Sequence, residues 1–134
     1  MWTFPHYTPG KLPDWQALEH RFSWFADMKN VPQDPEWHAE GDVFVHTKMV
    51  CEALLQLPEF QALSEQEQHI LLAAAMLHDV EKRSTTKREI QGGKERIVSP
   101  NHAKKGEYTA RTLLYTELAA PFAVREAIAK LVRR

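Results

Sequence analysis

Apolar residues recur every three or four positions along most of the chain, which is the spacing that places side chains on one face of an α-helix. The first stretch with this pattern follows Asp14, a residue that can cap a helix at its N-terminus. Its apolar face consists of Trp15, Leu18, Phe22 and Phe25. Two prolines in the segment 30–35 then restrict the backbone to extended conformations, so a loop is predicted there.

Two further helices are predicted in the middle of the chain. The second begins near Asp42 and ends before Pro58, and its buried side consists of Val43, His46, Val50, Ala53, Leu54 and Leu57. The third begins with a capping box formed by Ser64 and Glu67. Its run over residues 70–80 is apolar almost all round, which is typical of a helix at the centre of a core.

The last third of the chain predicts a loop, a hairpin and two more helices. A loop is expected over residues 83–86, and the glycine pair at positions 92 and 93 favours a short hairpin near residues 88–98. A fourth helix is predicted from Ser99 to about Leu118, and a fifth from Pro121, since proline suits the first helical position. The expected fold is therefore all-α, a bundle of about five helices with this one hairpin.

Length and composition favour one compact domain over residues 1–134, because 43% of the residues are hydrophobic and can form a core without a disulfide. The single Cys51 lies in an apolar run and is expected to be a small buried residue. No segment approaches the ~18 consecutive apolar residues of a membrane span. The sequence also begins without a basic region followed by an apolar one, so a cytoplasmic protein without a membrane partner is predicted.

Charge is divided unequally along the chain, although the net charge is only −1. Residues 1–80 contain 4 Lys or Arg and 12 Asp or Glu, whereas residues 81–134 contain 13 and 6. A solvated helix face would explain the basic half. The same residues also suit an anionic substrate such as a phosphate ester, because cations attract phosphate and reduce its repulsion of a nucleophile.

Two histidines, His46 and His78, lie on apolar helix faces, where an unpaired imidazole costs free energy. Each alone is more often a hydrogen-bonded core residue than a metal ligand. His78 and the adjacent Asp79, however, follow the end of the predicted central helix, where both side chains can reach a cavity at the rim of the core. Imidazole and carboxylate ligands without thiolate suit a divalent ion such as Mn, Mg, Ni, Co, Fe or Zn.

These residues occur in three segments that together resemble the HD superfamily of metal-dependent phosphohydrolases. The segments are Glu40–Val50 around the first histidine, Leu72–Lys82 around the His-Asp pair, and Ile97–Glu107 around His102. They are similar to the HD domains of bacterial CCA-adding tRNA nucleotidyltransferases and to related HD modules joined to ATPases. The resemblance covers residues 36–134 and leaves residues 1–30 as an N-terminal helical extension.

The resemblance implies hydrolysis of a phosphoester in a nucleotide or an RNA end by a metal-activated water. His46, His78 and Asp79 match the first metal ligands, and His102 matches an additional histidine beside the metal. Asp79, Lys82 and His102 are the expected catalytic residues, with Lys82 as a phosphate contact. Weaker candidates for phosphate binding are Thr86, Lys104, Lys105 and Arg111.

Two positions depart from the HD pattern. Glu81 stands where a small glycine is common, which would narrow the pocket or alter its charge. The late aspartate ligand is also absent, since no Asp follows Asp79 and no His follows His102. Three explanations stay open: the chain is truncated at its C-terminus, Glu107 or another carboxylate substitutes, or catalysis has been lost.

Three functions are therefore considered. The first is the phosphohydrolase, acting on a phosphorylated small molecule, a nucleotide or an RNA end, with a fused or associated ATPase or nucleotidyltransferase as a partner. The second is a non-catalytic metal- or nucleotide-sensing domain serving a partner. The third is a helical interaction module, in which two structural histidines accompany a tryptophan-rich N-terminal region.

Overall fold

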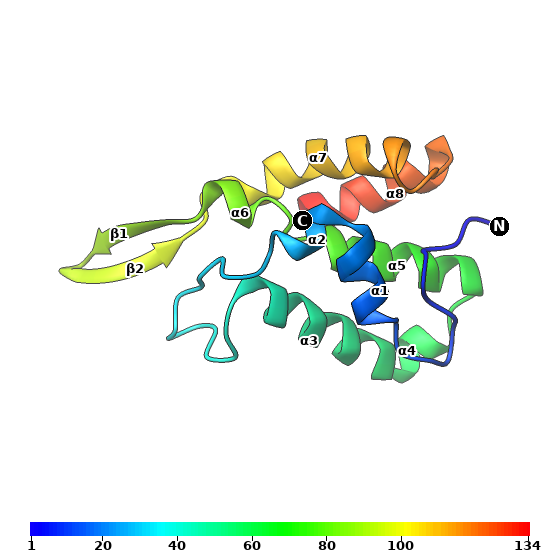
Figure 1. Cartoon of the computed structure of the whole chain (residues 1–134), viewed down its shortest axis with the longest axis horizontal. Helices are drawn as coiled ribbons and strands as arrows, with labels where there is room; N and C mark the ends of the chain where they lie inside the picture. The colour runs from blue at the N-terminus through cyan, green and yellow to red at the C-terminus, as the bar shows by residue number, and fades with distance from the viewer.

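The computed structural model describes all 134 residues and contains eight helices and one two-stranded sheet (Figure 1). The helices are α1 (Trp15–Arg21), α2 (Ser23–Ala26), α3 (Val43–Gln56), α4 (Pro58–Gln61), α5 (Glu65–Leu77), α6 (Lys82–Thr85), α7 (His102–Thr116) and α8 (Phe122–Arg133). The strands are β1 (Lys87–Gln91) and β2 (Lys94–Val98). None of the helices is long and apolar enough to cross a membrane.

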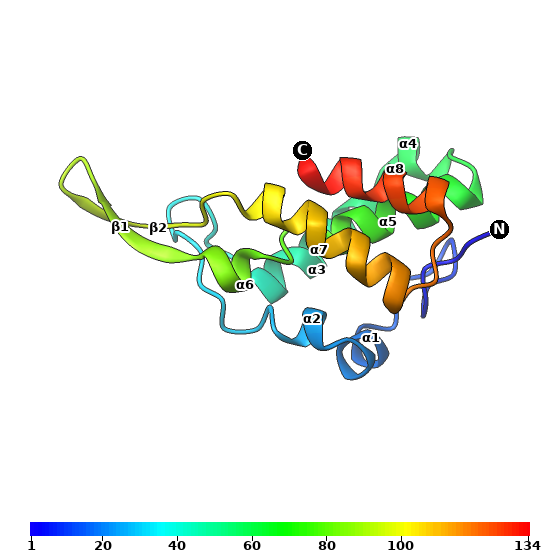
Figure 2. The same ribbon diagram turned by 90° about the horizontal axis from the view of Figure 1, so that it is seen from above.

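Helix α5 lies at the centre of the helical body, packed against α3 on one side and α8 on the other (Figures 1 and 2). Helix α7 packs along α8. The capping box of Ser64 and Glu67 starts α5 as predicted, and its side chains Leu72, Ala73, Met76 and Leu77 are fully buried. The N-terminal segment shares this core through Phe4, so residues 1–30 cover the helices instead of forming a separate body.

The prediction of a five-helix bundle is wrong, first because the N-terminal helix is divided. Phe22 adopts an extended conformation between α1 and α2. In one continuous helix, Phe22 and Trp24 would point in nearly opposite directions. The break buries both rings, which stack with their centroids 5.2 Å apart.

Two short helices also lie where the sequence predicted only the end of a helix, at Pro58, and a loop, over residues 83–86. Pro58 does not only stop α3 but begins α4, since a helix needs no N–H at its first position. Helix α6 occupies residues predicted as loop, and the hydroxyl groups of Ser84 and Thr85 donate to the carbonyl oxygen of Glu81. Both helices have four residues, too short for apolar periodicity to indicate them.

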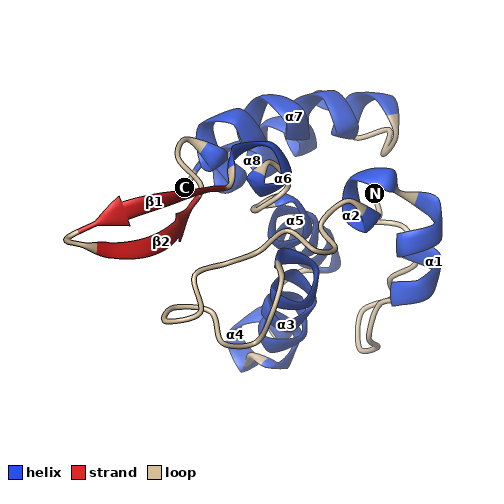
Figure 3. Ribbon diagram, turned by 60° about the vertical axis from the view of Figure 1, so that its left-hand side comes forward, coloured by secondary structure: helices blue, strands red, loops and turns tan.

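The fold is also not all-α, because β1 and β2 form an antiparallel hairpin that projects from the helices (Figures 1 and 3). Gly92 and Gly93 connect the strands with φ angles of 58° and 78°, which favour glycine. At its base, the backbone N–H of Ile97 donates to Asp34, and Arg96 pairs with Glu36. The hairpin is therefore tied to the loop that precedes α3.

Candidate metal centre

Four elements converge at the end of the helical body next to the hairpin (Figure 3). His46 lies in the first turn of α3, whose start is fixed by Asp42 accepting a hydrogen bond from the backbone N–H of Val45. His78 caps the C-terminus of α5 and is followed by Asp79. His102 is the first residue of α7, and Lys82 is the first of α6.

The carboxylate of Asp79 is the centre of this group, although the residue is only 3% exposed. Its Oδ2 lies 3.0 Å from Nε2 of His78, 3.8 Å from Nε2 of His46 and 3.5 Å from Nζ of Lys82. Its Oδ1 lies 3.2 Å from Nε2 of His102. The structure thus brings together the five residues that the sequence singled out: His46, His78, Asp79, Lys82 and His102. The three histidines all face Asp79 through Nε2.

The other ring nitrogen, Nδ1, of each histidine contacts an oxygen atom. These distances are 2.5 Å from His46 to Glu40 Oε1, 2.6 Å from His78 to the carbonyl oxygen of Ala75, and 3.0 Å from His102 to that of Ser99. Because carbonyl and carboxylate oxygens only accept hydrogen bonds, each Nδ1 carries the proton. In the neutral rings, each Nε2 then has a free lone pair, as in histidines that bind metal through Nε2.

A positive charge is needed where these Nε2 atoms meet Asp79. Lone pairs and carboxylate oxygens 3.0–3.2 Å apart repel each other unless a proton or a metal ion lies between them. Burial alone would raise the pKa of Asp79, but His102 and His78 hold it well below its usual value, so the carboxylate is ionised. Burial lowers the pKa of His78, yet its contacts with Asp79 and with the carbonyl of Ala75 together raise the pKa by more.

The donor set fits a divalent cation. One ligand atom each from His46, His78 and Asp79 can be chosen so that all lie within 4.8 Å of one another. Nitrogen and oxygen donors without sulfur suit a borderline or hard ion. His102 faces the same carboxylate from its other oxygen, at the edge of this three-residue group. Cys51 is fully buried and belongs to no such group of ligands, and its burial raises the pKa of the thiol to about 12.

Lys82 occupies the side of the centre nearest the loop before α3. Its ammonium donates a 2.8 Å hydrogen bond to Oε1 of Gln33, and its side chain is 13% exposed. It therefore presents a positive charge beside Asp79 with little freedom to move.

A second group of possible ligands adjoins the first and was missed in the sequence. It consists of His38, Glu40 and His46, with Nδ1 of His38 3.5 Å from Glu40 Oε1. A hydrogen bond to its own backbone and another to His46 lower the pKa of Glu40, so it stays ionised. His38 and Glu40 lie in a loop without periodicity, so only the fold brings them to His46.

Other residues considered from the sequence have different partners. The buried carboxylate of Glu81 accepts hydrogen bonds from Ser84 and Thr109, on α6 and α7, so it does not narrow the cavity beside the centre. Glu107 pairs with Arg111 and Arg133, and is thus occupied outside the centre. The remaining phosphate candidates also lie outside it: Thr86 contacts Ser99, Lys105 donates to Ser84, Arg111 also binds Glu126, and Lys104 is exposed.

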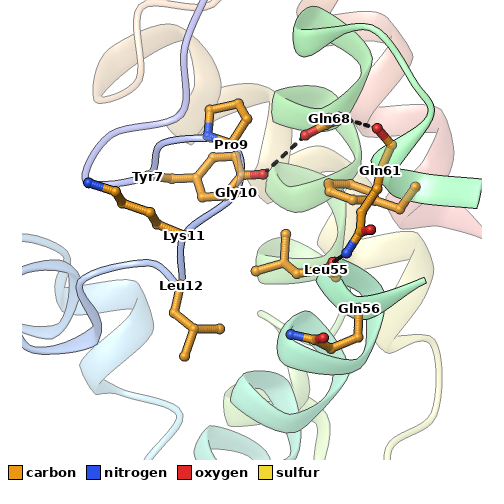
Figure 4. A pocket seen from close by; sticks show the side chains of 10 residues that line it. Tyr7, Pro9, Gly10, Lys11, Leu12, Leu55, Gln56, Gln61 and Gln68 are labelled. Atoms are coloured by element: carbon orange, nitrogen blue, oxygen red, sulfur yellow. Dashed lines mark hydrogen bonds between the residues drawn. The ribbon is translucent and has the colours of Figure 1, made fainter. Parts of the chain in front are cut away.

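Two cavities differ in their relation to this centre. One of about 180 Å³ opens beside it and is lined by Lys82, His102, His38 and the loop before α3. The largest, of about 530 Å³, lies between the N-terminal segment and helices α3 to α5 (Figure 4). Several of its polar groups bind one another, with Tyr7 donating to Gln68 and Gln61 to the carbonyl of Leu55, and none of its lining residues belongs to the centre.

No family model, no curated protein and no solved structure matches this chain.

Proposed function

We propose that this protein is a metal-dependent phosphohydrolase of the HD type, acting on a phosphoester in a nucleotide or an RNA end. The observation that carries the proposal is the meeting of three Nε2 atoms at the buried carboxylate of Asp79, while each Nδ1 is bound to an oxygen atom. This arrangement is typical of a metal centre, whereas histidines that only pack in a core do not need to meet at one carboxylate.

The ion would be held by His46, His78 and Asp79, with His102 beside it. When bound, a divalent cation makes water a stronger nucleophile and stabilises negative charge on phosphoryl oxygens. The protein contributes fixed ligand orientations, because each imidazole is held at Nδ1 by a different acceptor. Burial of Asp79 strengthens the attraction between its charge and the ion.

The surroundings favour an anionic substrate. Lys82 places its ammonium next to the centre, where it would bind a phosphoryl oxygen. Helix α7, of 15 residues, begins at His102 without a side-chain cap, so its first backbone N–H groups and its dipole also favour an anion there. His102 would then contact the ion or the phosphate bound to it.

The second candidate is a metal- or nucleotide-sensing domain without catalysis. It is favoured by the small number of carboxylates at the centre, where Asp79 alone contacts the three Nε2 atoms and Glu107 is paired elsewhere. Such a domain would bind the same ions and phosphate compounds without hydrolysing a phosphoester.

A phosphoester screen with added Mn, Ni or Co separates these functions. We expect the wild-type protein to release phosphate or open a cyclic phosphodiester with at least one ion. Asp79→Asn should abolish this turnover, and His102→Ala should reduce it much more than it reduces folding stability. The matched control is His20→Ala, because His20 is exposed on α1. Metal binding without turnover on the whole panel would favour the sensing domain.

A further inference from the structure

The cavity beside the metal centre is built mainly by the loop between α2 and α3, which the proposed hydrolysis leaves without a role. Its volume is about 180 Å³, and its lining includes Gln33, Trp37, His38, Lys82, Ser99 and His102. His102 and Lys82 also contact Asp79, so the cavity opens directly on the centre.

One buried donor in the cavity wall lacks a partner. Gln33 is only 8% exposed, and its Oε1 accepts a hydrogen bond from the ammonium of Lys82. An ammonium can only donate, so this contact fixes the orientation of the amide. The Nε2 group of Gln33 is then left without an acceptor and almost without accessible surface, which costs about 1–3 kcal/mol, so a ligand in the cavity reaches it only if this side chain shifts.

An aromatic ring at the same cavity is also free. Trp37 is 73% exposed, whereas Trp2, Trp15 and Trp24 each pack against a phenylalanine. Trp37 takes part in none of the aromatic or cation-π pairs of the chain. An exposed indole at the rim of a polar cavity is a surface on which a flat ring can stack.

We infer that this cavity binds the base of a nucleoside monophosphate, with Trp37 stacking on the ring and Gln33 donating to a ring acceptor. The inference rests on the proposed function, since the phosphate of the same molecule would lie at Asp79 and Lys82. The cavity volume of about 180 Å³ is smaller than the roughly 300–1,000 Å³ of pockets that enclose a whole drug-sized ligand. The cavity therefore suits one ring, with the sugar and phosphate outside it.

The test compares AMP, which has a base and a phosphate, with ribose 5-phosphate, which lacks the base. Binding to the full chain is measured by calorimetry and by tryptophan fluorescence, in the presence of a divalent ion with which AMP releases no phosphate. AMP should bind more tightly and quench the fluorescence. Trp37→Ala should weaken AMP binding by roughly 5- to 100-fold and leave ribose 5-phosphate binding unchanged.

Two further variants act as controls. Trp37→Phe should retain most of the AMP affinity, because it keeps a ring, but should lose most of the fluorescence quenching. Trp2→Phe should keep both, because Trp2 donates to the carbonyl of Leu118, away from the cavity. Circular dichroism checks that each variant is folded, as expected for Trp37 at an exposed position.

The outcomes distinguish this inference from the proposed function. Equal affinity for AMP and ribose 5-phosphate, or an equal loss of both in Trp37→Ala, would overturn the base site and leave hydrolysis untouched. AMP binding through Trp37 without turnover of any phosphoester would support the base site and reject hydrolysis. Failure of AMP to bind at all would overturn the base site.

Discussion

Each histidine at Asp79 is fixed by a different kind of oxygen atom: a carboxylate, the carbonyl of its own helix, or the carbonyl of a turn. His78 uses Ala75, three residues earlier in the chain, and His102 uses Ser99 in the same way. His46 is the exception, because its partner Glu40 comes from the preceding loop and carries a full charge. A carboxylate partner raises the basicity of a ligating imidazole more than a carbonyl does.

Glu40→Gln is therefore expected to weaken binding of the divalent ion by about 10- to 100-fold, because His46 loses its charged partner. Calorimetric titration of the ion measures this directly. Glu59→Gln serves as the control, since Glu59 is exposed on α4 and should bind the ion like the wild type. Equal ion affinity in both variants would show that Glu40 does not contribute to binding of the ion.

Lys82 is expected to bind the substrate of the proposed hydrolysis and not the metal ion. Lys82→Ala should lower kcat/KM for a phosphoester by roughly 10- to 100-fold, the effect of losing one charged hydrogen bond. The metal content should stay the same, because an ammonium cannot bind a cation. Steady-state kinetics and metal analysis check the two parts, with Lys87→Ala on the exposed strand β1 as control. Kinetics like those of the wild type would show that Lys82 only holds Gln33.

At the scale of the element, α5 carries one structural histidine, and a second, which reaches the proposed metal centre, follows this helix directly. Nδ1 of His69 accepts a hydrogen bond from the backbone N–H of Phe4 and joins the N-terminal segment to the core. Nδ1 of His78 donates instead, to the carbonyl of Ala75. The two rings thus hold their proton on opposite nitrogens.

The pH dependence of stability tests the structural role of His69. Burial lowers its pKa, by more than the nearby Glu65 raises it. An unfolded histidine has a pKa of about 6.5, so the unfolded chain binds this proton more readily than the folded protein. The stabilisation is therefore complete above about pH 6.5 and is lost as the pH falls through the lower folded pKa.

His69→Gln should reduce this loss, because the amide oxygen can still accept from Phe4 but does not titrate. The variant should be about 1 kcal/mol less stable than the wild type near neutral pH, and this difference should shrink as the pH falls. Urea unfolding over this pH range measures it. The opposite influence of His78, whose pKa is raised, is common to both proteins. A difference that grows on acidification would contradict the account.

The sequence predicted where the long elements lie, because their signals are local, but the predicted buried side of α3 was wrong. That side is formed by Val43, Phe44, Thr47, Cys51 and Leu55, whereas Leu57 is exposed. The capping box of Ser64, the apolar run of α5 and the glycine pair of the hairpin each lie within a few residues of the feature they determine. The break at Phe22 was not predictable, since it depends on burying Trp24 as well, in a core formed with distant helices. Elements of four residues, such as α6, are likewise set by contacts with Glu81 instead of periodicity.

At the scale of the whole molecule, the centre joins three segments that are far apart in the sequence, around His46, His78 and His102. The candidate ligands could be named because three short motifs occur in order, and the structure places them around one carboxylate. Glu40, Gln33 and Trp37 could not, since their positions depend on how the loop before α3 is held. That loop is tied to the base of the hairpin through Asp34 and Glu36.

The hairpin tip, in contrast, should be independent of the centre. Gly93→Val places a branched side chain at a φ of 78°, which costs roughly 1–2 kcal/mol for the local turn. We expect faster hydrogen exchange in β1 and β2 because the strands are largely exposed, and the free energy of unfolding of the whole protein should fall by no more than this roughly 1–2 kcal/mol. Ion affinity should be unaltered. A loss of ion binding in this variant would show that the tip supports the centre.

The central claim is that a divalent ion binds between Asp79 and the surrounding imidazoles, and calorimetric titration with Mn²⁺ tests it most directly. The wild-type protein should bind one ion per chain and be stabilised by about 2.7 kcal/mol when the free ion is at 100 times its Kd. Asp79→Asn should abolish both effects, while Glu59→Gln should retain them. Failure of the wild type to bind Mn²⁺, Ni²⁺ or Co²⁺, or equal binding by Asp79→Asn, would contradict the claim.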